Sequence, residues 1–464
     1  MLLAIAGWIR YRFGAVSLEQ IISNLPIGQG KGIGNNGLAV EAVGFCIVAP
    51  ILLVSAAALG ERHLHQPIVA TRGARFIPLA AFITGLAVLL GVAGVPEYAI
   101  AQFSEQSLAA YYVRPAVTST PSTPKNLITI YLESTENTFG DPDLMGRNLL
   151  ANLDEATEGW ADYRGLEQYA GGGWTMAGLV ATQCGIPLKS QLTVEGLDYN
   201  KMGEQVDHYL PGATCLGDVL AAQGYTNVFV GGADDDFAGK KTFLGDHGYS
   251  RVYGLSDWKA DGEDPDQISE AWGLSDARMT AHALEVLKGL HASSRPFNLT
   301  MLTLDTHEPA GVFPGCSTDD AIAMATAITC STRAVARFLG AAQAAGYLDD
   351  TVVMVMGDHL KGTGDHDSFR DALLRADHRT IVFRVWSPHA VVRYARESAD
   401  QLSVLASTLE LLGFGVDHGR AGVGVSFVQS HELSRTALAL PSQEYRTLLL
   451  APSSELYRGF WQGR

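Results

Sequence analysis

From residue 126 onward, the chain alternates short apolar strand segments with longer helical segments. Each strand segment is an almost unbroken apolar run, which is typical of strands covered on both faces. The expected strands are 126–132, 227–230, 298–304, 351–356 and 381–386, and the expected helices include 215–223, 276–290 and 328–345. This alternation predicts an α/β fold with a doubly wound, mostly parallel sheet and helices on both of its faces.

Residues that can bind a metal or transfer protons stand just beyond three of these strands. Glu133 follows the first strand, and Asp358 and His359 follow the fourth. His307 stands shortly after the third. Ligands of open α/β sheets bind at the carboxyl ends of the strands, so we expect these side chains to gather at one edge. Each alone is more typical of an ordinary loop residue, and the repetition after three buried strands is what indicates a site.

The residue types suit a divalent cation. Glu133, Asp358 and His359 offer two carboxylates and an imidazole. With the hydroxyl of Thr175 they make a mostly oxygen ligand set, which suits Mn²⁺ or Mg²⁺ and can hold Zn²⁺. Such an ion would activate a threonine hydroxyl for nucleophilic attack. His307 could bind a phosphate oxygen or protonate a leaving alkoxide.

Thr175 stands where a glycine-rich turn meets a helical segment. Three glycines at 171–173 precede it, and the helical pattern 176–183 follows it. The free N–H groups and the dipole of a helix N-terminus favour a phosphate or an alkoxide. A threonine here is also a common N-cap that only satisfies backbone donors. Because acids and histidines follow three strands elsewhere in the chain, we favour the interpretation that Thr175 is a nucleophile.

Two polar loops hold weaker candidates. Lys240 and Lys241 follow the strand at 227–230 and could contact a phosphate, although a solvated surface pair is at least as typical. The acidic runs at 234–236 and 365–367 resemble metal clusters, but acidic loops are the more ordinary explanation.

Two apolar segments near the start of the chain are long enough to cross a bilayer. They cover 38–59, in which Glu41 is the charged residue, and 76–95, which is uncharged. A buried hairpin is the alternative. The loop between them is rich in arginine, so the positive-inside rule places it in the cytoplasm and everything after residue 96 outside. Three basic residues before residue 32 would share that outer side, which weakens this orientation.

The expected domain order has four parts. A membrane segment with two transmembrane helices covers 1–100, and a linker rich in Pro, Ser and Thr covers 101–125. A catalytic domain covers 126–430, and a short tail covers 431–464.

Cysteine usage and charge limit the environment and the partners. Cys46 lies in an apolar run, and the other four of the five cysteines allow three pairings as two disulfides. Their position after the membrane segment agrees with an oxidising compartment. The formal net charge is −16 without a basic cluster, so we expect no nucleic-acid partner.

Five motifs resemble the phosphoglycerol transferase I family, whose members move phosphoglycerol from phosphatidylglycerol onto periplasmic glucans. The motifs are NLITIYLEST at 126–135, GWTMAGLVATQCGIPL at 173–188, FAGKKTFLGDHG at 237–248, DTHEPAG at 305–311 and GDHL at 357–360. The likeness covers roughly 96–430. The domain also resembles lipoteichoic acid synthase and, more distantly, sulfatases and alkaline phosphatase.

The resemblance implies an alkaline-phosphatase-like fold with one divalent cation, most commonly Mn²⁺. Thr175 would be the nucleophile and, together with Glu133, Asp358 and His359, a metal ligand. His307 would contact the substrate, and Lys240 would stand where related synthases carry an arginine. Trp174 would also contact the substrate. The resemblance further implies two disulfides, Cys184–Cys215 and Cys316–Cys330.

The implied function is that of a transferase in the bacterial inner membrane with a periplasmic catalytic domain. It would move sn-glycerol 1-phosphate from phosphatidylglycerol to a glucan through a covalent intermediate. The chain departs from the family at Glu308, where a second histidine often stands. Longer members also carry more transmembrane helices and a further domain, so the acceptor is less certain than the chemistry.

Several alternatives stay open at this point. A sulfatase would need Cys or Ser followed by Pro and Arg at the nucleophile, and the sequence at 175–179 has none of these. A phosphoethanolamine transferase shares the metal and threonine chemistry but holds another lipid head group. A lipid phosphodiesterase would act without an acceptor. A membrane receptor without activity would have no use for the acid, histidine and threonine set.

Overall fold

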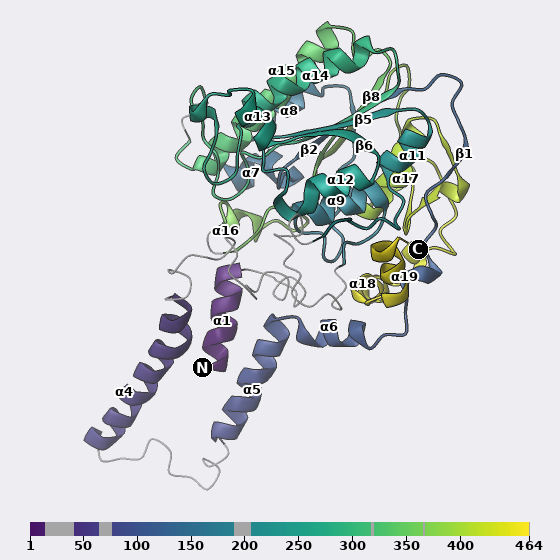
Figure 1. The fold of residues 1–464 in the computed structure, drawn as a ribbon. Coiled ribbons are helices and arrows are strands. Elements are labelled where there is room, and N and C mark those ends of the chain that lie inside the picture. Colours follow the sequence, from purple (N-terminus) through teal and green to yellow (C-terminus); the bar gives the residue numbers. More distant parts are fainter. Residues whose placement is uncertain (14–40, 65–76, 190–205, 317–319, 365–366, 464) are drawn as a thin grey trace. The chain divides into compact units, whose positions relative to one another are not determined.

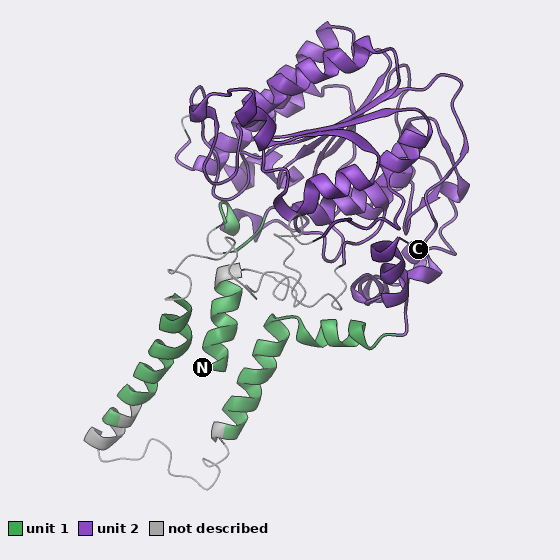
Figure 2. Cartoon of the chain, in the orientation of Figure 1, with its two compact units in different colours: residues 1–104, 362–370 green, residues 105–361, 371–464 purple. Residues whose placement is uncertain are grey.

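The computed structural model describes the chain except residues 14–40, 65–76, 190–205, 317–319, 365–366 and 464. It forms two compact units (Figure 2). Unit 1 contains residues 1–104 and 362–370, and unit 2 contains residues 105–361 and 371–464. All of the expected site residues belong to unit 2.

Unit 2 is built on a seven-stranded sheet with the order β3-β9-β8-β2-β7-β5-β6. These strands are β2 (Asn126–Leu132), β3 (Ala161–Asp162), β5 (Thr226–Gly231), β6 (Tyr249–Tyr253), β7 (Phe297–Leu302), β8 (Thr351–Gly357) and β9 (Phe383–Trp386). The strands from β8 to β6 run parallel, whereas β9 is antiparallel to β8 and to β3. Strands β2, β7 and β8 bury every residue. The predicted doubly wound, mostly parallel sheet is therefore confirmed.

Helices cover both faces of this sheet (Figure 1). One layer contains α8 (Ala151–Ala156), α14 (Asp276–Ala292) and α15 (Ala323–Ala344), and the other contains α9 (Thr175–Cys184), α11 (Leu216–Ala222), α12 (Lys240–Asp246) and α17 (Val404–Leu411). Shorter helices are α7 (Pro142–Met145), α13 (Leu255–Ala260) and α16 (Arg370–Leu373). Small two-stranded sheets use β1 (Val117–Ser119), β4 (Leu166–Glu167), β10 (Ala399–Asp400), β11 (Gly415–Val416), β12 (Arg420–Ala421) and β13 (Gly424–Val425).

The sequence pattern missed the two edge strands β3 and β6. Strand β6 exposes Ser250 and Arg251, so it lacks the apolar run of a central strand. Strand β3 has only two residues. Edge strands are covered less completely than central ones, and their sequences carry a correspondingly weaker signal.

The last residues of the chain form α18 (Ser442–Leu450) and α19 (Ser454–Gln462), and both helices belong to unit 2. Tyr457 and Phe460 are buried in the same apolar core as α9. The Tyr457 hydroxyl donates to the carbonyl of Pro187, and the Trp461 indole donates to the carbonyl of Lys189 at 3.0 Å. These helices therefore hold the segment that follows α9.

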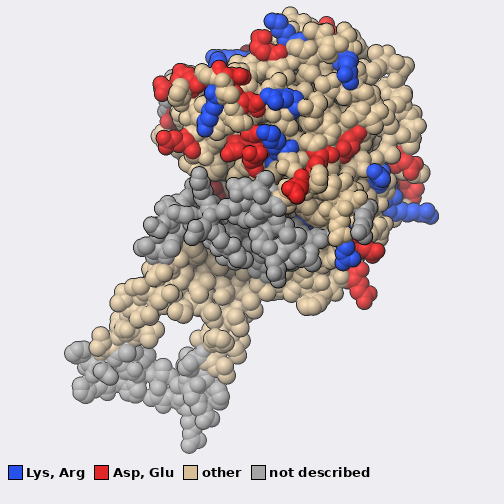
Figure 3. Space-filling model, viewed as in Figure 1, with Lys and Arg blue, Asp and Glu red and all other residues tan. Residues whose placement is uncertain are grey.

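The described part of residues 1–104, in unit 1, is mostly helical. Its helices are α1 (Leu2–Phe13), the π-helix η1 (Gly44–Val48), α4 (Ala49–Leu64), α5 (Ile77–Val92) and α6 (Val95–Gln102). No single helix among the described residues combines the length and the apolar character needed to cross a bilayer. The bent pair Leu79–Val92 and Val95–Gln102 meets the requirement only when taken together, with a 66° angle between its helices. On the face shown in Figure 3, charged side chains lie over unit 2, and the visible described helices of unit 1 show none.

Candidate active site

The ends of two central strands bring the acidic residues together. Strand β2 pairs with β8 so that Leu132 lies opposite Gly357. Glu133 and Asp358 are the next residues of the two strands, and parallel pairing therefore places them side by side. Both are buried, with exposed fractions of 2% and 0%. The predicted meeting of strand ends is observed.

The backbone of Glu133 is fixed by the segment that directly follows the neighbouring strand β7. Its N–H donates to the hydroxyl of Thr303 at 2.9 Å, and its carbonyl accepts from the hydroxyl of Thr306 at 2.6 Å. Ser134 follows with a positive φ of 51°, which is uncommon for a residue with a side chain. This conformation directs the Ser134 N–H to Asp358 Oδ1 at 2.8 Å, which joins the two acidic positions.

Two glycines permit the close approach of the site segments. A Cβ at Gly357 would lie 2.0 Å from the carbonyl oxygen of Thr135. A Cβ at Gly178, in helix α9, would lie 2.2 Å from the carbonyl oxygen of Asp358. Real Cβ atoms do not approach so closely, so only glycine lets α9 pack directly on the backbone of a site residue.

Thr175 lies at the N-terminus of a helix, as expected, but α9 begins at Thr175 itself and not at the expected residue 176. Its hydroxyl donates to Glu133 Oε2 at 3.1 Å. Trp174 stands at the N-cap position, where its side chain makes no capping hydrogen bond, and it packs partly buried against the core. The free N–H groups of the first helical turn therefore face the same edge of the sheet as the acidic residues.

Glu133, Asp358 and His359 form a compact set of three buried groups. One ligand atom from each lies within 4.8 Å of the others. His359 Nε2 is 3.5 Å from Glu133 Oε1 and 3.6 Å from Asp358 Oδ2. His359 Nδ1 donates to the carbonyl of Leu360 at 2.9 Å, which leaves Nε2 as the nitrogen facing the carboxylates.

The electrostatics of this set point to a cation. Burial alone would raise the pKa of Glu133, but the charges of His359 and His307 offset it and lower the pKa to about 2. Burial and the charge of Glu133 raise the pKa of Asp358 well above its ordinary value. The Oδ2 atom of Asp358 is buried and has no hydrogen-bond partner among the described residues. A buried carboxylate oxygen beside a second carboxylate is suited to a divalent ion.

His307 is held next to this set on the loop after β7. Its charge acts on Glu133, which places the two in electrostatic range. Nδ1 of His307 donates to the carbonyl of Glu308 at 2.9 Å, so Nε2 is the nitrogen available to a substrate. The ring of Trp272 lies against the imidazole, with 3.8 Å between ring centroids.

The segment from Trp272 to Asp276 holds this loop from a distant part of the sequence. Asp276 is fully buried, and its carboxylate accepts from the N–H groups of Leu304 at 2.6 Å and Asp305 at 3.2 Å. Burial raises the pKa of Asp276 to about 6. These two residues are not among the site residues expected from the sequence, because a tryptophan and an aspartate near the start of a helix carry no motif that connects them to His307.

The weaker candidates from the sequence, Lys240, Lys241 and the two acidic runs, differ in where the structure places them. Lys240 is 4% exposed at the start of α12, and burial lowers its pKa while the charge of Glu133 opposes this. It therefore lies in electrostatic range of the site, unlike a solvated surface lysine. Asp235 binds Lys241 at 2.5 Å and Ser256 at 3.0 Å, which is a structural role. Part of the acidic run at 365–367 lies outside the described residues.

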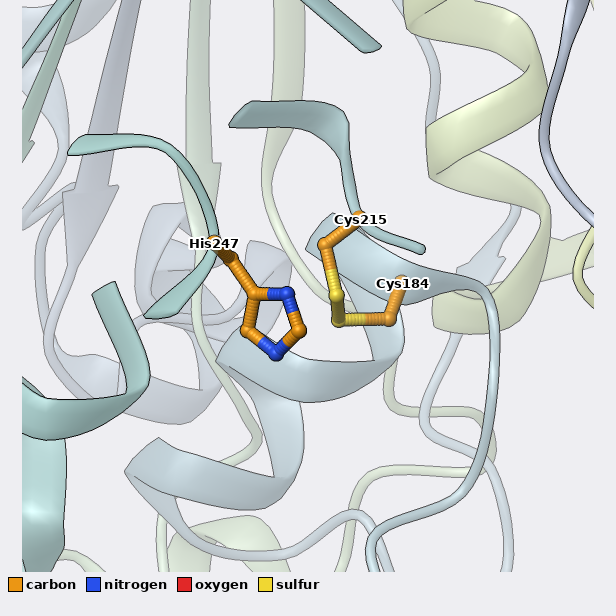
Figure 4. Close-up of side chains that lie close together, drawn as sticks. All are labelled: Cys184, Cys215 and His247. Carbon is orange, nitrogen blue, oxygen red and sulfur yellow. A yellow bond between two sulfur atoms is a disulfide. The ribbon is translucent and has the colours of Figure 1, made fainter. Parts of the chain in front are cut away.

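Both disulfides expected from the resemblance are present, Cys184–Cys215 and Cys316–Cys330. The first joins the end of α9 to the start of α11. His247 lies beside it (Figure 4), with Nδ1 at 2.8 Å from Asp218 and Nε2 at 3.1 Å from the carbonyl of Tyr209. The two sulfur atoms are bonded to each other, so this group anchors α9 and does not form a metal site here.

Comparison with known proteins agrees with this geometry. The Sulfatase family matches residues 125–414, which is more than half of the chain. The chain belongs to the sulfatase family. The matched segment contains the sheet, α9 and all of the expected metal ligands.

Curated relatives of this sulfatase-family chain are named phosphoglycerol transferase I. The protein of Xanthomonas campestris pv. campestris (strain B100) is 36% identical over 305 residues, which cover 63% of this chain and 42% of the relative. That of Xanthomonas euvesicatoria pv. vesicatoria (strain 85-10) is 33% identical over 411 residues, covering 83% and 55%. The chain thus spans about half the length of the curated relatives it matches.

Solved structures show the same fold. An alkaline phosphatase superfamily protein from Vibrio parahaemolyticus superposes with a TM-score of 0.56 at 18% identity, covering 79% of this chain and 96% of the other. The lipoteichoic acid synthase LtaP from Listeria monocytogenes gives 0.53 at 15% identity, covering 75% and 96%. The expected resemblance and the alkaline-phosphatase-like fold are confirmed.

Proposed function

We propose that this chain is a phosphoglycerol transferase of the bacterial inner membrane with its catalytic unit in the periplasm. It moves sn-glycerol 1-phosphate from phosphatidylglycerol to a periplasmic glucan. The observation that carries the proposal is the meeting of Glu133, Asp358 and His359 with Thr175 at the N-terminus of α9. The names of the curated relatives support this reaction.

The residues present fit one divalent cation. Glu133, Asp358, His359 and the Thr175 hydroxyl would hold it, and the buried Oδ2 of Asp358 supplies an oxygen that is otherwise without a partner among the described residues. When bound, the cation favours the deprotonated threonine oxygen and offsets charge on a phosphoryl group. The set contains two carboxylates and one imidazole, and we propose Mn²⁺, with Mg²⁺ and Zn²⁺ as alternatives.

In the first half of the proposed reaction, Thr175 Oγ attacks the phosphorus of phosphatidylglycerol. Its proton leaves in the direction of Glu133, to which the hydroxyl already donates. The bond between phosphorus and the diacylglycerol oxygen breaks, and His307 Nε2 supplies a proton to that oxygen. Diacylglycerol departs, and phosphoglycerol stays attached to Thr175.

In the second half, a glucan hydroxyl attacks the same phosphorus and passes its proton to His307. The bond to Thr175 breaks, and the threonine oxygen regains the proton that left toward Glu133 in the first half. Burial lowers the pKa of Lys240, and the charge of Glu133 opposes this. We propose that the Lys240 ammonium also offsets negative charge on the phosphate. We propose that Trp174, next to the nucleophile, contacts the donor.

Membrane attachment of the proposed enzyme is supported by the surface of unit 1. Four consecutive side chains of α4, from Ile51 to Val54, are 54% to 72% exposed. An apolar helix surface of this kind is suited to lipid. The two disulfides agree with a periplasmic catalytic unit. A reporter fused behind α19 should be active only if it works in the periplasm, and cytoplasmic activity would contradict this location.

The decisive experiment uses the purified full chain with Mn²⁺, head-group-labelled phosphatidylglycerol and candidate glucans. With the acceptor withheld, mass spectrometry should find a glycerophosphate adduct on the Thr175 peptide. Thr175→Ala should abolish both the adduct and the transfer, and Thr175→Ser should keep some activity because the hydroxyl remains. A fully active Thr175→Ala variant would refute the mechanism. Release of free glycerophosphate despite every acceptor would indicate a phosphodiesterase, and a preference for labelled phosphatidylethanolamine would indicate a phosphoethanolamine transferase.

A further inference from the structure

An ion pair joins the two loops that carry the histidines of the site. Glu308 directly follows His307, and Lys361 stands two residues after His359. The Nζ atom of Lys361 is 3.0 Å from Oε1 of Glu308. The lysine side chain is 3% exposed and that of the glutamate 25% exposed, so Glu308 is the more accessible partner.

Both ends of this pair are held by the protein. The N–H of Lys361 donates to Glu136 at 3.2 Å, and its carbonyl accepts from Arg379 at 2.6 Å. Arg379 in turn donates to Glu136 at 2.9 Å, and that carboxylate is completely buried. On the other side, the carbonyl of Glu308 accepts from the His307 ring. The pair therefore occupies a fixed place relative to the imidazole that faces the substrate.

The chemistry of the pair distinguishes between neutral and cationic ligands. A carboxylate accepts hydrogen bonds and an ammonium group donates them, whereas a hydroxyl does both. A vicinal diol can donate to Glu308 and accept from Lys361 without adding charge. A ligand ammonium can only donate, and it would meet a carboxylate whose charge is already offset, next to the positive charge of Lys361. Placing like charges together in a half-buried site is unfavourable.

We propose that Glu308 and Lys361 form the head-group subsite of the enzyme, which takes the hydroxyls of an uncharged polyol phosphate and rejects a cationic amino-alcohol head group. This inference rests on the proposed function, because it names what selects the donor of that reaction. It assigns the donor preference to two residues outside the metal ligands and the nucleophile.

The test compares phosphatidylglycerol with phosphatidylethanolamine as head-group-labelled donors of the full chain with Mn²⁺. The unaltered enzyme should favour phosphatidylglycerol in kcat/KM. Lys361→Met removes the positive charge that offsets the Glu308 carboxylate. The remaining negative charge attracts an ammonium group, so the donor ratio should move at least about tenfold toward phosphatidylethanolamine. Glu308→Gln removes the negative charge beside the lysine and should move the ratio in the opposite direction. A purely structural ion pair would not give opposite shifts.

The control removes an ion pair elsewhere in unit 2. Arg278 binds Glu263 at 2.8 Å, and Arg278→Met should leave the donor ratio unchanged. Lys361→Met could fail to fold because the lysine is buried. In that case the kcat/KM ratio of the two donors in Glu308→Gln decides whether the subsite exists. Calorimetry on the Thr175→Ala protein measures binding without turnover. In this protein sn-glycerol 1-phosphate should bind more tightly than phosphoethanolamine. Adding Glu308→Gln should weaken the binding of sn-glycerol 1-phosphate.

Four results would overturn the subsite. Equal losses with both donors in Glu308→Gln would show a structural role. A preference of the unaltered enzyme for phosphatidylethanolamine would contradict the charge argument. Turnover of phosphatidylglycerol with a ratio that no variant changes would remove the subsite and leave the proposed function intact. Turnover of neither donor, with Thr175 unmodified, would remove both.

Discussion

Replacing Gly178 with alanine should separate Thr175, the proposed nucleophile, from the proposed metal ligands. The added Cβ would start 2.2 Å from the carbonyl oxygen of Asp358, while ordinary contacts begin at 3.4 Å. Helix α9 or the Asp358 backbone must therefore retreat by about 1.2 Å. Thr175 lies three residues earlier on the same helix, so it should move by a similar amount. A displacement of about 1 Å can reduce catalysis on the order of 10²-fold.

The assay follows diacylglycerol release from phosphatidylglycerol, together with the free energy of unfolding. We expect Gly178→Ala to lower kcat on the order of 10²-fold. Overpacking should lower the free energy of unfolding by about 1–3 kcal/mol. The matched control is Gly289→Ala, in helix α14, where an added Cβ meets no atom within 4 Å. That variant should keep full activity and gain about 0.5–1 kcal/mol, because alanine loses less backbone entropy in a helix.

The reasoning fails if Gly178→Ala keeps the activity of the unaltered protein. It also fails if the two glycine variants lose activity equally, because the loss would then follow from the substitution type and not from the contact with Asp358. If the Gly178→Ala protein unfolds in the assay, its kcat cannot be measured. Gly178→Ser cannot replace it, because serine carries the same Cβ. In that case the readout is the free energy of unfolding, which must fall in Gly178→Ala while it rises or stays unchanged in the control.

Three further predictions concern metal binding, pH and His307, the proposed substrate histidine. Asp358→Asn should raise the thermal midpoint of the metal-free protein, because it removes a carboxylate that repels its neighbour, and should abolish the further rise with Mn²⁺; a retained rise would place the metal elsewhere. The hydrogen bond from Arg278 lowers the pKa of Glu263 from 4.5 to about 2, so its contribution to stability is present above pH 4.5 and lost as pH falls toward 2. Denaturation of Glu263→Gln across that range should show a shallower pH dependence, and an unchanged slope would disprove the assignment. Trp272→Ala should lower kcat about tenfold by releasing His307, with Trp272→Phe restoring most of it, and equal activity of both variants would show that the ring contact has no role.

Much of the site could be predicted because its main residues adjoin strongly patterned elements. Strands that are buried on both faces leave continuous apolar runs in the sequence, and Glu133, Asp358 and His359 follow such runs directly. Thr175 follows a glycine run and begins a helix, which is a local pattern as well. The pairing of the cysteines, by contrast, was open on spacing alone and came from the family resemblance.

The edge strands and the supporting residues could not be predicted in this way. Strand β6 is half exposed, so its residues lack an apolar run. Trp272 and Asp276 precede a helix in sequence, and only the packing of that segment on the loop after β7 brings them to His307. The requirement for glycine at 178 likewise depends on which backbone the helix meets.

The sequence by itself determined the strand and helix periodicity, the acids and histidines at strand ends, and the threonine at a helix start, because each depends on neighbours along the chain. Only the tertiary structure decided the strand order that places Leu132 opposite Gly357 and the ion pair between Glu308 and Lys361. These contacts join residues far apart in sequence, and local periodicity carries no information about which distant segment will pack against which.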